Sequence, residues 1–79
     1  MTLYEFNLLE DNVQYDTVWN RGAFLDTVFE KGIKINVYAL DMFFIEVVYD
    51  IGQNKITELR TFKEGHRLDK YSKGLKNYF

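Results

Sequence analysis

The chain contains no cysteine, which excludes disulfide bonds, thiolate metal ligands and a cysteine nucleophile. Its one histidine, His66, is interpreted as a helix-cap or surface residue, and its one serine, Ser72, as part of a solvated helix face. We therefore expect a non-enzymatic protein with no cofactor and no metal.

The glycines are all isolated, and none belongs to a G-x-G-x-x-G or G-x-x-x-x-G-K-[ST] sequence, so nucleotide binding through such loops is excluded. No apolar run nears the ~18 residues that cross a bilayer, and no signal peptide opens the chain. The expectation is a cytoplasmic protein without membrane contact.

With 79 residues, of which 47% are hydrophobic and 28% charged, the chain is expected to fold as one α+β domain spanning residues 1–79. Its charge is uneven, because residues 1–50 hold nine acids against three bases and residues 51–79 hold seven bases against three acids. Either the basic end packs on the acidic body, or it forms a patch that faces an anion.

The N-terminal part predicts one helix or two short ones. Thr2 and Glu5 have the spacing of a capping box, so a helix should begin there. The polar residues 10–12 leave the choice between one helix and two open, and Gly22 is predicted to end the helical region in a left-handed conformation. The apolar stripe is read as Leu3, Phe6, Leu9, Val13 and Trp19.

From residue 23 the apolar period changes to two, which predicts a four-stranded antiparallel meander with strands at about 23–29, 33–39, 43–50 and 55–62. Leu68, Tyr71 and Leu75 then predict a short C-terminal helix.

Three-residue turns at 30–32, 40–42 and 52–54 would place most apolar strand residues on one face, toward the N-terminal helix. A two-residue first turn would instead set Asp26 beside Val37 in the core, which we expect to be unfavourable.

The opposite face would then carry an aromatic row of Phe24, Tyr38, Phe44 and Phe62, with Glu46 and Arg60 paired across strands beside it. Soluble proteins rarely leave an apolar surface of this size exposed to water, so another element or molecule is expected to pack on the row. The predicted C-terminal helix, a second protein chain, or a small-molecule or base-stacking ligand could each cover it. Asp26, Glu46 and Glu58 on the same face would repel phosphates, so nucleic acid is not favoured there.

Five segments distributed over nearly the whole chain share a further pattern: 4–9 (YEFNLL), 21–25 (RGAFL), 38–47 (YALDMFFIEV), 56–62 (ITELRTF) and 68–71 (LDKY). In these segments the chain resembles a family of small bacterial proteins of unknown function. The resemblance implies a stand-alone bacterial cytoplasmic protein, and it supplies no activity, cofactor or site residue.

The leading hypothesis is a protein-interaction or regulatory module that binds a partner protein, or a second copy of itself, through Phe24, Tyr38, Phe44, Phe62, Glu46 and Arg60. By analogy, small acidic α+β proteins can neutralise a larger basic protein through complementary charge. The alternatives are nucleic-acid binding by the basic residues 63–76 and a small-ligand or catalytic site on the outer-face carboxylates.

Overall fold

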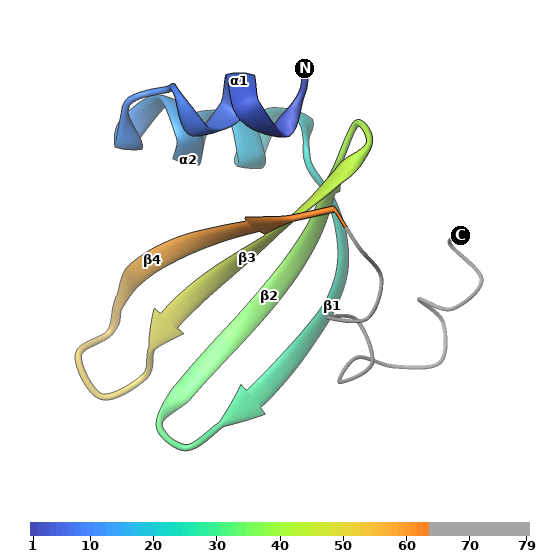
Figure 1. The fold of residues 1–79 in the computed structure, drawn as a ribbon. Coiled ribbons are helices and arrows are strands. Elements are labelled where there is room, and N and C mark those ends of the chain that lie inside the picture. Colours follow the sequence, from blue (N-terminus) through green and yellow to red (C-terminus); the bar gives the residue numbers. More distant parts are fainter. Residues whose placement is uncertain (64–79) are drawn as a thin grey trace.

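A computed structural model of the chain describes residues 1–63, so the predicted C-terminal helix and His66 lie outside the described residues. Two helices precede a four-stranded antiparallel sheet with strand order β1-β2-β3-β4, as predicted for the α+β class (Figure 1). The elements are α1 (Leu3–Asn7), α2 (Asp11–Arg21), β1 (Ala23–Glu30), β2 (Ile33–Leu40), β3 (Phe43–Asp50) and β4 (Lys55–Phe62).

The predicted capping box starts α1. The Glu5 backbone N–H donates to the Thr2 hydroxyl at 3.1 Å, and the Thr2 backbone N–H donates to the Glu5 carboxylate at 2.7 Å. The polar residues that follow separate α1 from α2, so the two-helix alternative is the one observed. Glu10, the residue before α2, has an extended backbone, and its side chain makes no capping hydrogen bond.

Gly22 does follow the helical region, but the predicted left-handed conformation is wrong. Its φ is −75° and its ψ is 143°, which is extended backbone. Glycine suits the position for a different reason: a Cβ there would lie 2.7 Å from the carbonyl oxygen of Val18. The chain can therefore turn directly from α2 into β1 only where no side chain intervenes.

The first two turns have two residues, not the predicted three. Glu30 lies opposite Ile33 and Leu40 lies opposite Phe43, which leaves Lys31–Gly32 and Asp41–Met42 as the loops. Gly32 (φ 72°) and Asp41 (φ 52°) adopt the left-handed conformations that tight hairpin turns use. The third turn spans four residues, 51–54, yet the predicted pairs Phe44–Phe62 and Glu46–Arg60 are confirmed, because a bulge near the turn restores the register.

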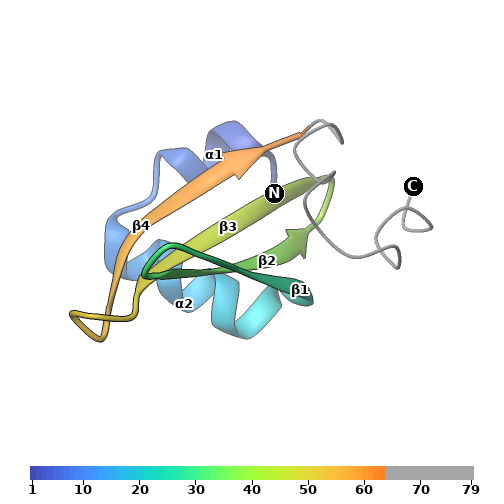
Figure 2. The same cartoon turned by 90° about the horizontal axis from the view of Figure 1, so that it is seen from below.

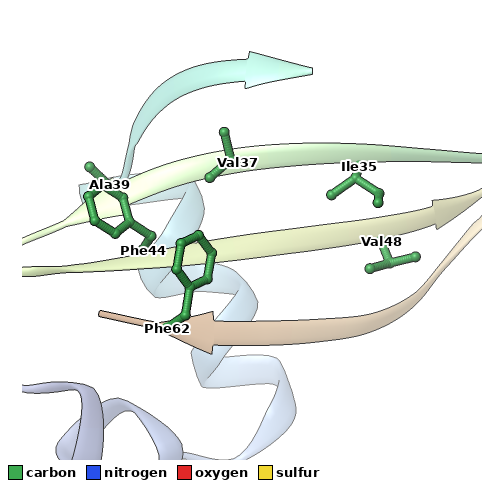
Figure 3. Packing of buried hydrophobic residues seen from close by; sticks show 6 residues of the cluster. All are labelled: Ile35, Val37, Ala39, Phe44, Val48 and Phe62. Atoms are coloured by element: carbon green, nitrogen blue, oxygen red, sulfur yellow. The ribbon is translucent and has the colours of Figure 1, made fainter. Parts of the chain in front are cut away.

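These shorter turns exchange the two faces of β2 relative to β3, so apolar side chains line both faces of the sheet. The helix-side face packs with Phe6 of α1 and Val18 of α2 and consists of Tyr38, Leu40, Phe43, Ile45, Val47, Ile56 and Leu59. The opposite face, called the second face below, consists of Ile35, Val37, Ala39, Phe44, Val48 and Phe62 (Figure 3). The prediction of a single apolar face was wrong.

Candidate functional site

The predicted aromatic row is divided between the two faces. Phe24 pairs with Tyr38, which is on the helix-side face, whereas Phe44 and Phe62 belong to the second face. The rings of Phe44 and Phe62 stack with centroids 5.4 Å apart, and the two residues are only 4% and 7% exposed. The four rings therefore do not form one partner-binding surface, and that prediction is corrected.

Glu46 and Arg60 do face each other, but Glu46 lies inside the protein. Glu46 is 1% exposed, and its Oε1 is 3.5 Å from Nε of Arg60. Asp26, which lies opposite Val37 in the same row, is half-buried, and its Oδ1 accepts a hydrogen bond from the Thr27 backbone N–H at 2.8 Å. Burial of Glu46 closes this row to a substrate arriving from solvent, which argues against the carboxylate-site alternative.

A different group of aromatic side chains is exposed where α2 meets β1. Trp19 from the end of α2 and Phe24 from β1 are 49% and 57% exposed. Both contact Tyr38 edge to face, with centroids 5.8 Å and 5.6 Å from its ring. We call these three residues the aromatic corner.

The sequence-based prediction included Phe24 and Tyr38 among the partner-binding residues and assigned Trp19 to the apolar stripe of the first helical region, whereas the structure brings the three rings together. The buried residue in that turn is Val18, at 0% exposure. The spacing of six between Val13 and Trp19 was the available signal, because it does not match a helical stripe. The contact of Trp19 with β2 is long-range and could not be read from the sequence.

One exposed carboxylate adjoins the aromatic corner on the helix. Asp16 precedes Trp19 by one turn and is exposed. The basic residue of the last turn, Arg21, lies 3.3 Å from Asp41. The corner therefore combines apolar rings with the exposed carboxylate of Asp16.

The outer strands of the sheet are poorly suited to pairing with another strand. A bulge interrupts β1 between Phe24 and Asp26, and another displaces Thr57 of β4 from the β3 register. Bulges and charged residues are devices by which proteins discourage edge-to-edge pairing. Recognition at the corner would therefore use side chains.

Asp41 joins the N-terminus to the second hairpin. Its Oδ2 lies 2.7 Å from the Met1 ammonium, and this hydrogen bond is the main reason that the pKa of Asp41 is below its usual range, with the charge of Arg21 adding to the effect. Beside it is a depression of about 140 Å³, lined by Met1, Thr2, Leu3, Met42, Phe43 and Lys63. Ligand sites usually measure about 300–1,000 Å³, so the depression is small for one.

Within residues 1–63, no group of three metal-binding side chains comes together. The same part of the chain includes no helix with the length and apolar character to cross a membrane. No family model, curated protein or solved structure matches the chain. The resemblance to a bacterial family stays a prediction.

Proposed function

We propose that the chain is a non-enzymatic protein-binding module whose contact surface is the aromatic corner. The observation that carries this proposal is the half-exposure of Trp19 and Phe24 while both rings are held against Tyr38. Tryptophan and tyrosine are enriched among residues that dominate binding energy, and rigid rings lose little conformational entropy on binding.

The area available sets what else a partner must offer. Large aromatic side chains bury about 150–250 Å² each, so covering the exposed halves of two rings removes roughly 200 Å² from water. At about 25 cal/mol per Å², this burial contributes about 5 kcal/mol to the free energy of binding. That is comparable to the free energy lost when two molecules give up translational and rotational freedom on association. The corner is thus an anchor that needs additional contacts around it.

The charge around the corner indicates the chemistry of those contacts. Asp16 lies beside Trp19, and residues 1–50 carry nine acids against three bases. A partner protein with an apolar pocket flanked by lysine or arginine would cover the rings and complement this charge. Its association rate would fall as salt is added.

Trp19 is the single tryptophan, so its fluorescence reports directly on the corner. Proteins retained by the wild-type chain should be lost from Trp19→Ser and Phe24→Ser baits but kept by Leu8→Ser, which changes a residue that is 86% exposed outside the corner. The purified partner should then shift Trp19 emission to shorter wavelength on titration and bind the Leu8→Ser chain with unchanged affinity.

Two results would contradict the proposal. One is a partner that binds the wild type and both corner variants equally well. The other is a labelled RNA or DNA bound with steep salt dependence and no change in Trp19 emission, which would favour the nucleic-acid alternative. Of the basic residues in that alternative, the structure describes Lys63, whose Nζ lies 5.0 Å from the centroid of the Tyr4 ring.

A further inference from the structure

The second face is buried although both described helices pack on the other side of the sheet. Its apolar residues are 0–7% exposed, with Ile35 and Val37 at 0%, and Glu46 among them is 1% exposed. Figure 3 shows the six side chains projecting from β2, β3 and β4, with helix behind the sheet, and Figure 2 shows both helices on one side. An apolar sheet face is stable only beneath another layer, so this face has a covering element.

We propose that residues 64–79 of the same chain are the element that covers the second face. This inference does not depend on the aromatic corner. The segment follows Lys63 directly, and Phe62 before it already packs on the second face against Phe44. The described chain therefore ends beside the surface that the segment would cover.

The segment is long enough for the task. Four strands at about 4.8 Å separation span about 14 Å from the first to the last. Sixteen residues extend about 24 Å as a helix at 1.5 Å per residue, so less than the whole segment suffices to cross the sheet.

The composition of the segment also fits the second face. Leu68, Tyr71 and Leu75 fall on one side of the predicted helix, which would supply an apolar stripe for Val37 and Val48. The segment holds four bases against two acids, and the face holds the acids Asp26 and Glu46. A carboxylate as buried as Glu46 is stable only among donors and cations, and a basic cover brings more of them to the side of Arg60.

Connection within one chain favours this occupant over a second copy. A tethered segment meets its surface at a high effective concentration, whereas a segment of another molecule must associate at the concentration of the protein. We therefore expect the cover to persist in a dilute monomer.

One matched pair of substitutions in the full chain tests the apolar contact. Leu75→Asp and Asn77→Asp each add one negative charge, but position 75 lies on the predicted stripe and position 77 on the opposite side. Leu75→Asp should lower the urea midpoint clearly and increase dye binding to exposed apolar surface, and Asn77→Asp should leave both unchanged. Equal effects of the two variants, including no effect of either, would overturn the proposal.

A second measurement keeps the proposal testable if Leu75→Asp fails to fold. Because the chain lacks cysteine, a single nitroxide label can be attached at Lys76→Cys. In the labelled molecule, the methyl signals of Ile35 and Val48 should broaden more than those of Ile45 and Val47 on the helix-side face. A label at Leu8→Cys is the control, and it should affect the helix-side face more.

Mixing labelled chains with unlabelled, isotope-enriched chains separates the two sources of broadening. Broadening of the second face only within the labelled molecule supports a cover supplied by the same chain. Broadening of that face in the unlabelled partner, or equal broadening of both faces, would overturn the proposal.

Discussion

Replacing Phe6 with alanine should remove the main attachment of α1 to the sheet. Phe6 is the buried residue of this five-residue helix, at 0% exposure, and its ring centroid lies 5.7 Å from that of Phe43. Loss of a buried phenylalanine side chain costs about 3–5 kcal/mol, including about 0.5–1.5 kcal/mol for a well-oriented aromatic pair.

That loss is large for a domain of this size. At about 0.05–0.15 kcal/mol per residue, a chain of 79 residues has an unfolding free energy of about 4–12 kcal/mol. With an m-value of about 1.5 kcal/mol per molar urea, the midpoint should fall by about 2–3 M. Circular dichroism and Trp19 fluorescence can both follow the transition.

Leu8→Ala is the control, because Leu8 lies immediately after α1 and is 86% exposed. Its free energy of unfolding should change by no more than about 0.5 kcal/mol. The packing described for Phe6 would be refuted if Phe6→Ala cost less than about 1 kcal/mol, or if both variants were equally destabilised.

Three further outcomes are expected. Gly32→Val should lose about 1–2 kcal/mol in urea unfolding because Gly32 has a φ of 72°, whereas Gly32→Asn should lose less, since asparagine tolerates that conformation; equal losses would contradict this. Because the pKa of Asp41 is lowered in the folded chain, its contacts stabilise the fold above the ordinary pKa and are lost as the pH falls through the lowered one. Wild-type stability should therefore fall more than that of Asp41→Asn on acidification below about pH 4, and parallel curves would count against it. Thr2→Ala should cost about 1 kcal/mol in urea unfolding because the hydroxyl that accepts from the Glu5 backbone N–H is lost, and unchanged stability would contradict the capping-box account. The Glu5 pKa should rise only in part in an NMR titration, because the Thr2 backbone N–H, the main cause of its lowering, is retained while the smaller side-chain contribution is lost.

Local signals in the sequence were sufficient to identify the start of the helical region and the four strands. The Thr2–Glu5 spacing located the start of α1, and the alternation after residue 23 gave strands whose limits differ from the observed ones by at most one residue. These features depend on neighbouring residues, whose preferences the sequence displays directly.

The faces of the sheet could not be inferred in the same way, because the prediction depended on a single apolar face. Residues 43–48 are an almost continuous apolar run, which is typical of a strand buried on both faces. Asp26 was expected to be unfavourable beside Val37, yet it lies there, because it is on an edge strand at a bulge and is only half-buried. An edge position allows a carboxylate to keep partners that a central strand would remove.

The two proposed surfaces share strand β2, which makes their independence testable. Tyr38 supports the aromatic corner on one face, and Val37 and Ala39 lie in the second face immediately beside it in sequence. If the cover only stabilises the fold, Leu75→Asp should leave the partner affinity of the folded chain unchanged, and its effect on stability should add to that of Phe24→Ser in the double variant. Weaker partner binding by the folded Leu75→Asp chain would instead mean that the cover holds β2 in the position from which Tyr38 orients Trp19, so that binding at the corner would depend on the opposite face.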